Sequence, residues 1–181
     1  MTDLSTLRIV RYPDPILKKT CAPVEQFGEE LRGLTERMLE LMKQGGGIGL
    51  AGPQVGLLIR IFVCNATGEP QDDLVCVNPH LSDLCGAGDA EEGCLSIPGV
   101  TVTMRRATKA TIKACDAEGR SFVRTGLDLV ARVWQHEADH LEGRLITDHM
   151  STADEISNRR ALKQLRDDYT GGRRQAGARR Q

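Results

Sequence analysis

Residues 127–141 place the strongest constraint on how this chain can fold. The apolar and histidine positions of this segment recur every three or four residues and would share one face of a helix: Leu129, Val133, His136 and His140. Two histidines one helical turn apart, about 5.4 Å along the axis, can bind the same metal ion. We therefore expect a central helix whose histidine face forms part of a metal site.

Residues 136–140 read His-Glu-Ala-Asp-His, a pattern typical of metal-dependent hydrolases. Glu137 directly follows the first histidine, where a carboxylate can exchange protons with the attacking water. The pattern supplies only two protein ligands, whereas a catalytic zinc-type site usually has three and keeps one position open. The source of the third ligand therefore decides which class of enzyme the sequence encodes.

Three positions are candidates for that ligand. Downstream, Gly143 fits the metzincin pattern, but the next ligand position is Ile146, which cannot bind metal. Glu155 would give a thermolysin-like metalloprotease, although a role in capping a helix explains it equally well. Upstream, Cys94 follows a glycine just ahead of a predicted strand, and its thiolate would complete a Cys-His-His site. A non-catalytic zinc module would need a fourth ligand, for which no residue has convincing spacing.

The glycine-rich segment 47–54 indicates a close approach of backbone to a substrate. Gly47 to Gly52 match the dinucleotide fingerprint Gly-x-Gly-x-x-Gly, but they follow a predicted helix, and Pro53 and Gln54 lead into a strand. This context contradicts a dinucleotide site, so we expect the glycines to make room for substrate. The Gln54 amide can donate a hydrogen bond to a developing oxyanion.

The remaining pattern indicates an α+β fold. A helix is expected over 26–44, and another is expected to begin near Ser151 or Thr152, where Thr152 and Glu155 resemble a capping box. Five segments rich in Val, Ile, Thr and Cys are predicted strands: Arg60–Cys64, Leu74–Asn78, Val100–Arg105, Ala110–Asp116 and Ser121–Thr125. Such closely spaced strands favour antiparallel pairing. We expect antiparallel sheets around the metal-binding helix, with a C-terminal helix.

The length of 181 residues fits one domain, which we place over residues 1–170, followed by a basic disordered tail over 171–181. Residues 151–181 carry eight Lys and Arg against four Asp and Glu, although the net charge of the chain is −1. The N-terminus has no signal-peptide pattern, and no apolar run of about 18 residues exists, so we expect a cytoplasmic protein. None of the six cysteines forms a Cys-x-x-Cys pair, which is consistent with free thiols.

Three motifs occur in the order and spacing of the peptide deformylases, and the chain resembles that family. They are Gly47–Gln54, Glu92-Gly93-Cys94-Leu95-Ser96 and Gln135–His140, and both Pro13–Leu17 and Leu141–Leu145 add to the likeness. The resemblance covers about residues 7–150. The chain departs from the family pattern at Gly52, where the family usually has alanine, and we expect this glycine to loosen the loop slightly.

The resemblance implies a metal-dependent hydrolase that removes the N-formyl group from the starting methionine of new polypeptides and releases formate. It implies that Cys94, His136 and His140 bind one divalent ion. This ion is usually Fe²⁺ in the family, with Zn²⁺, Ni²⁺ or Co²⁺ able to occupy the site. The substrates would be N-formylmethionyl peptides.

The resemblance also assigns roles to other residues of the three motifs. Glu137 would act as the base and then as the acid, while Gln54 and the backbone N–H of Leu95 would stabilise the oxyanion. Apolar side chains and glycine backbone would line the peptide site: Ile48, Gly49, Gly93, Leu129 and Val133.

Residues around these would support the site. Glu92 is expected to brace it, with Arg106 as its partner, and Arg132 to border the pocket entrance. Gln135 and Asp139 are expected to orient the histidine rings.

The C-terminal helix suggests a second role, because some bacterial deformylases carry a C-terminal helical extension that docks on the ribosome. Basic side chains would then meet RNA phosphates: Arg159, Arg160, Lys163 and Arg166. A solvated helix packed on the domain edge is the simpler alternative.

Overall fold

The computed structural model describes residues 4–169, and within that range it contains three α-helices and seven β-strands. The helices are α1 (Glu29–Gln44), α2 (Asp128–Leu141) and α3 (Thr152–Asp168). The strands are β1 (Gly49–Ala51), β2 (Ile61–Cys64), β3 (Leu74–Cys85), β4 (Gly88–Gly93), β5 (Thr101–Arg106), β6 (Lys109–Cys115) and β7 (Ser121–Leu127). The predicted tail over 171–181 lies outside the described residues.

Five strands form one antiparallel sheet in the order β1-β2-β3-β6-β7. Strand β2 is buried on both faces: Phe62 and Cys64 pack in the same core cluster as Trp134 of α2, while Ile61 and Val63 pack in the cluster that contains α1. This alternation follows the two-residue period of a strand. Helices α1 and α2 therefore cover opposite faces of this half of the sheet.

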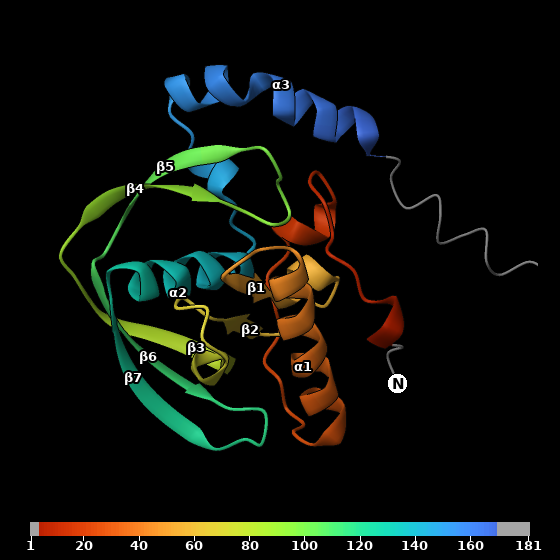
Figure 1. Cartoon of the computed structure of the whole chain (residues 1–181), viewed down its shortest axis with the longest axis vertical. Coiled ribbons are helices and arrows are strands. Elements are labelled where there is room, and N and C mark those ends of the chain that lie inside the picture. The colour runs from red at the N-terminus through yellow and green to blue at the C-terminus, as the bar shows by residue number, and fades with distance from the viewer. Residues whose placement is uncertain (1–3, 170–181) are drawn as a thin grey trace, which may run out of the picture.

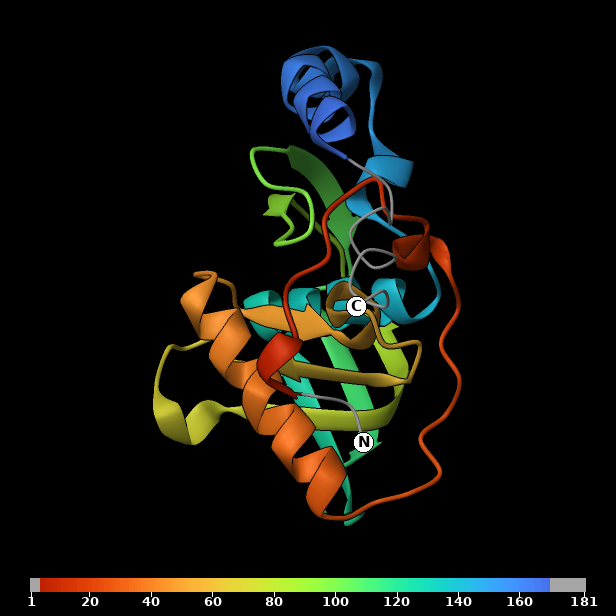
Figure 2. The same cartoon turned by 90° about the vertical axis from the view of Figure 1, so that its right-hand side faces the viewer.

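Strands β4 and β5 form a separate antiparallel pair. Helix α3 covers this pair, because Leu162 shares a core cluster with Val102. Asn158 of α3 accepts a hydrogen bond from the Thr101 N–H at 3.1 Å and donates one to the Thr101 carbonyl at 2.7 Å. Figures 1 and 2 show the resulting stack, with β4 and β5 between α3 and α2. No helix within residues 4–169 is long and apolar enough to cross a membrane.

The α+β class, the antiparallel sheets and the C-terminal helix are confirmed, but several boundaries differ from those predicted. Helix α1 begins at Glu29 instead of residue 26, because Gly28 has a φ of 145° that no helix contains. The strand predicted to end at Asn78 continues through an irregularity in the β3–β6 register. The Asn78 side chain bonds to the backbone N–H and carbonyl of Val24 there, at 2.8 and 2.9 Å.

The N-terminus of α3 is capped one residue earlier than expected. Ser151, not Thr152, is the cap: its hydroxyl accepts from the Asp154 N–H at 3.2 Å, and Asp154, not Glu155, accepts from the Ser151 N–H at 2.9 Å. The capping pair therefore lies one residue earlier in the sequence than the predicted pair.

Strands β1 and β4 were not predicted from the sequence. Both contain glycine, and β4 also carries three acidic residues, so neither has the Val, Ile and Thr content typical of strands. Their partners β2 and β5 supply the pairing. The two strands lie beside α2, where they deliver residues of the candidate site.

Candidate metal centre and active site

Helix α2 carries two of the predicted metal ligands and the predicted catalytic carboxylate. The rings of His136 and His140 lie one turn apart, with centroids 5.0 Å from each other. Glu137 and His140 are buried. The helix takes this position because Ala131 and Trp134 pack into the core of the five-stranded sheet, which leaves the histidine face directed toward β4 and β5.

Cys94 directly follows β4 and lies beside the two histidines. Its Sγ is 3.3 Å from Nε2 of His140, and one ligand atom from each of the three residues lies within 4.8 Å of the others. Glu155, the alternative third ligand, is exposed on α3 and does not belong to this group. The structure therefore brings together the upstream cysteine and not the downstream glutamate.

The chemistry of this group fits a divalent transition metal, because thiolate and imidazole donors suit such ions. Nδ1 of His136 is engaged by Glu92, which leaves Nε2 for a metal. Beside the group, the buried Oε2 of Glu137 has no hydrogen-bond partner within residues 4–169. Buried polar atoms normally have a hydrogen-bond partner, so this oxygen is suited to bond to a water or substrate that enters the site.

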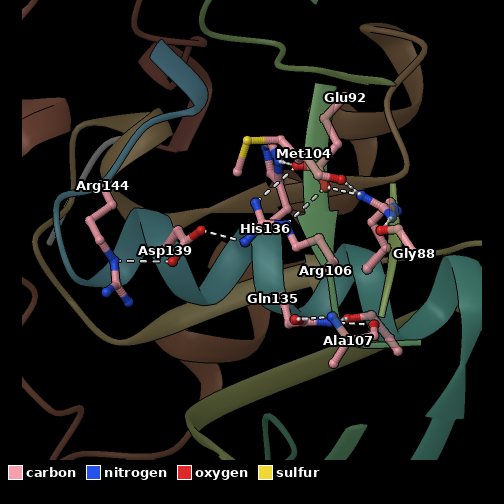
Figure 3. Close-up of polar contacts among 11 residues, drawn as sticks. Gly88, Glu92, Met104, Arg106, Ala107, Gln135, His136, Asp139 and Arg144 are labelled. Atoms are coloured by element: carbon pink, nitrogen blue, oxygen red, sulfur yellow. Dashed lines mark hydrogen bonds and ion pairs between the residues drawn. The ribbon is translucent and has the colours of Figure 1, made fainter. Parts of the chain in front are cut away.

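Glu92 of β4 is held by donors from two other elements. Arg106 of β5 donates through Nε and Nη2, both at 2.9 Å, and Nδ1 of His136 lies 3.0 Å from Oε2 (Figure 3). A fourth donor, Nη1 of Arg132, lies 2.8 Å from Oε1. Burial raises the pKa of the Glu92 carboxyl, but hydrogen bonds from Arg106 and His136 outweigh it and hold the pKa well below its usual range.

Gln54 points its amide nitrogen toward the same group. Its Oε1 accepts a hydrogen bond from the Ala51 N–H at 2.8 Å. Because a backbone N–H can only donate, this bond distinguishes the amide oxygen Oε1 from the amide nitrogen Nε2. Nε2 then lies 3.4 Å from Cys94 Sγ and 3.3 Å from Ser96 Oγ. The side chain is buried, which makes it a preorganised donor.

A cleft of about 520 Å³ opens beside these groups. Its lining includes every residue predicted for the peptide site, namely Ile48, Gly49, Gly93, Leu129 and Val133, together with Gln54, Cys94, Leu95, His136 and Glu137. Ile48 and Leu129 are exposed apolar side chains at this cleft. A Cβ at Gly49 would lie 2.1 Å from Oε1 of Glu137, so only glycine leaves room for that carboxylate.

Burial shifts the protonation of three groups in the site. It raises the pKa of the Glu137 carboxyl well above its usual range, with Cys64 and Glu92 adding to the effect. It raises the pKa of the Cys94 thiol to about 12 and lowers the pKa of His140 well below its ordinary value. In all three groups, burial shifts the balance from the charged toward the uncharged form.

Two supporting roles expected from the sequence are wrong. Gln135 and Asp139 do not orient the histidine rings: the Gln135 amide bonds to the N–H and carbonyl of Ala107 at 3.0 and 2.9 Å, and Asp139 pairs with Arg106 at 2.5 Å (Figure 3). The carboxylate that does bond to His136 is Glu92. Sequence spacing could not reveal this, because Glu92 and His136 lie on different elements.

The expectation that Gly52 loosens its loop is also wrong. A Cβ at this position would lie 2.7 Å from the Ile59 carbonyl oxygen and 2.9 Å from the Leu57 carbonyl oxygen. The Leu57 N–H also donates to the Gly52 carbonyl at 2.9 Å. The glycine therefore allows two backbone segments to pack closely beside Gln54.

A helix that presents two histidines to a cysteine, with a buried carboxylate beside them and an open apolar cleft in front, defines a metal-dependent hydrolase. The comparison with known families makes this specific. The family model described as polypeptide deformylase matches residues 6–155, and the chain belongs to the peptide deformylase family.

Named relatives and solved structures agree. The peptide deformylase of Hamiltonella defensa is 42% identical over 148 residues, covering 82% of this chain and 86% of the relative. That of Alkalilimnicola ehrlichii is 40% identical and covers 90% and 92%. The structure of a Legionella pneumophila peptide deformylase has a TM-score of 0.84 at 39% identity, covering 90% of this chain and 96% of that one.

A Plasmodium falciparum peptide deformylase structure has a TM-score of 0.85 at 33% identity, covering 90% of this chain and 96% of that one.

The activity of the chain follows from its membership of this family. It is hydrolytic removal of the N-formyl group from the N-terminal methionine of new polypeptides, with formylated peptides as substrates. The family and the Cys-His-His group together support a divalent metal.

Proposed function

We propose that Cys94, His136 and His140 are the protein ligands of the catalytic metal, and that this ion is Fe²⁺. The support for the ligand set is the convergence of their donor atoms within 4.8 Å. The choice of Fe²⁺ over Zn²⁺, Ni²⁺ or Co²⁺ rests on the family resemblance, because these donors suit several divalent ions. When bound, such an ion lowers the pKa of water and polarises the substrate carbonyl.

Glu137 is the proton carrier in this proposal. It takes a proton from the attacking water and then donates a proton to the departing amine nitrogen, which one carboxylate can do because the two steps are sequential. Two observations support the role. Its Oε2 has no hydrogen-bond partner within residues 4–169, and burial raises the pKa of its carboxyl well above the usual range.

Gln54 and the backbone N–H of Leu95 stabilise the oxyanion that forms on the former formyl oxygen. The support for Gln54 is its fixed amide, whose nitrogen points toward Cys94 Sγ at 3.4 Å. The support for Leu95 is its place in the cleft lining and the hydrogen bond that its carbonyl accepts from Nη1 of Arg11.

The methionine side chain of the substrate occupies the apolar part of the cleft, formed by Ile48, Leu129 and Val133. The peptide binds extended, with Gly49 and Gly93 presenting backbone groups to it as in an added strand. Because a formyl group is smaller than an acetyl group, a site that fits the formyl group closely should accept formyl-Met peptides and reject acetyl-Met peptides.

The convergence of Cys94, His136 and His140 beside Glu137 carries this proposal. Its test is formate release from formyl-Met-Ala-Ser by protein prepared anaerobically with iron, with metal analysis of the same sample. Cys94→Ala should lose both metal and activity, whereas Cys85→Ala, at an exposed cysteine, should retain both. Metal retention in Cys94→Ala, or equal rates on the acetyl-Met peptide, would contradict the proposal.

We also propose that the chain acts as one catalytic domain in the cytoplasm.

The ribosome is proposed as a partner of α3. The support for this contact is that Arg159 and Arg160 are exposed on α3. The other two predicted contacts are partly engaged, because Arg166 lies 3.2 Å from the Tyr12 hydroxyl and Lys163 pairs with Asp167. The simpler alternative is that α3 only covers β4 and β5.

Co-sedimentation with ribosomes at low salt separates these alternatives. Reversing both charges, Arg159→Glu with Arg160→Glu, should abolish the association if phosphate contacts drive it. Unchanged co-sedimentation would remove these two residues from the proposed contact and favour the simpler role.

A further inference from the structure

Arg132 of α2 makes a set of contacts that its place in the cleft lining does not explain. It lies one turn before His136, and Nη1 donates to Glu92 Oε1 at 2.8 Å and to the Met104 carbonyl at 2.9 Å. Nη2 donates to the Gly88 carbonyl at 2.7 Å. Figure 3 labels the three residues that accept these bonds, Gly88, Glu92 and Met104.

These acceptors belong to two different strands. Gly88 and Glu92 lie on β4, and Met104 lies on β5, so a single guanidinium spans the pair. A planar fork with five donors can do this, whereas an ammonium group is a compact point charge on a flexible stem. The side chain of Arg132 is only 13% exposed, so these bonds replace most of the water that the group would otherwise bind.

The placement of this strand pair matters because β4 supplies Glu92 and leads directly into Cys94. The pair is hydrogen-bonded within itself and not to the five-stranded sheet in the described part of the chain. Apart from the short connections to β3 and β6, its position relative to α2 therefore depends on side-chain contacts. Arg132 supplies three of them, and Gln135 supplies two more at Ala107, just beyond β5.

We propose that Arg132 is a positioning residue for deformylation, which holds β4 and β5 against α2 and completes the set of donors that fixes Glu92. Through Glu92 it keeps the ring of His136 in the orientation needed for a ligand. Arg132 acts through another residue and does not contact the reacting atoms. The inference rests on the ligand set proposed above.

Arg132→Leu tests this, because leucine keeps an apolar wall at the cleft while removing all three hydrogen bonds. Arg132→Lys keeps the charge but not the planar fork. Arg144→Leu is the matched control: Arg144 also pairs with a carboxylate of α2, Asp139, at 3.1 Å, but its side chain is 56% exposed and lies outside the cleft.

Three readouts apply to each variant. These are the affinity for Co²⁺ in competition with a chelator, the visible spectrum of the cobalt-loaded protein, and KM and kcat for formyl-Met-Ala-Ser. Arg132→Leu should lose about 10-fold in both Co²⁺ affinity and kcat, as expected for a residue that supports a metal ligand. Its cobalt spectrum should change, Arg132→Lys should fall between Arg132→Leu and the wild type, and Arg144→Leu should match the wild type.

A raised KM with unchanged Co²⁺ affinity and an unchanged spectrum would overturn the inference, because Arg132 would then be only a wall of the cleft. So would equal behaviour of Arg132→Leu and Arg144→Leu. If Arg132→Leu does not fold, as judged by thermal unfolding, Arg132→Lys carries the same comparison. Failure of the wild-type protein to bind Co²⁺ would instead contradict the proposed ligand set.

Discussion

Oε2 of Glu92 lies 3.0 Å from Nδ1 of His136, and this contact determines which nitrogen of the ring faces the cleft. An ionised carboxylate can only accept, so Nδ1 must carry a proton, and Nε2 is the ring nitrogen that remains for a metal. A carboxylate bonded to a ligand histidine also raises the basicity of the ring. The strand pair β4–β5 thus influences the chemistry of α2 through one hydrogen bond.

Replacement of Glu92 by glutamine should weaken metal binding and stability together. The amide removes the negative charge that pairs with Arg106 and Arg132, and the side chains of Glu92 and Arg106 are 5% and 8% exposed. Breaking a buried pair costs about 3–5 kcal/mol, because one charge remains uncompensated. Urea unfolding of the metal-free protein measures this cost. A loss below about 1 kcal/mol, typical of a surface ion pair, would show that the pair is not effectively buried.

The same residue predicts how stability depends on pH. The pKa of Glu92 is lowered in the folded protein by Arg106 and His136 against the effect of burial, whereas the unfolded chain has a glutamate pKa of about 4.3. Its stabilising contribution is therefore complete above that pH and declines as the pH falls toward the lower folded value. The difference in unfolding free energy between the wild type and Glu92→Gln should shrink from pH 6 to pH 3. A constant difference would contradict this.

Glu137→Gln should separate catalysis from metal binding. The amide cannot accept and return a proton, so kcat should fall by at least about 100-fold, the lower range for a general acid–base residue. The metal content should stay near that of the wild type, because Cys94, His136 and His140 are unchanged. Formate release and metal analysis on one preparation check both points. Near-full turnover would exclude Glu137 as the proton carrier.

Gly49→Ala should reduce activity by displacing Glu137. The added Cβ would meet Oε1 of Glu137 at 2.1 Å, so the carboxylate must move. A displacement of about 1 Å can cost about 100-fold in rate, and we expect a loss of that order in kcat. Gly33→Ala is the control, since its Cβ would meet only the flexible end of Leu4 at 3.1 Å, far along the chain from the cleft. Equal activities of the two variants would argue against the contact.

Metal uptake should release a proton from Cys94. Burial raises the pKa of this thiol to about 12, so it is protonated at neutral pH before a metal binds, and only the thiolate is a ligand. Metal affinity should therefore rise about 10-fold per pH unit between pH 6 and pH 8, for one proton displaced. An indicator dye can count the protons released on adding Zn²⁺ to metal-free protein. Uptake without proton release would mean that Cys94 is already ionised or is not a ligand.

The sequence predicted best what depends on local spacing. The histidine helix could be recognised because its motif and its apolar period lie within fifteen consecutive residues, and it forms α2 at the expected position. Cys94 could be named because its segment resembles the family, and the structure places its sulfur beside His140.

What the sequence could not predict depends on partners distant in the chain. Strand β4 forms because β5 pairs with it, although its own residues disfavour a strand. The contacts of Arg132 with Gly88 and Met104 cross from a helix to two strands, and no spacing rule describes them. Gly52 was misjudged for the same reason, since the carbonyl groups that exclude a side chain come from residues 57 and 59.

The bond between Asn158 and Thr101 has a consequence for the biosynthesis of the molecule itself. Asn158 satisfies both backbone groups of Thr101, and Asp154, one turn earlier, accepts from the Thr103 N–H at 3.5 Å. Two side chains of α3 thus hydrogen-bond to the edge of β5 that does not pair with β4. An unpaired strand edge could otherwise template aggregation. Because α3 follows every strand in the chain, this edge stays unprotected on a growing polypeptide until residue 158 has been made.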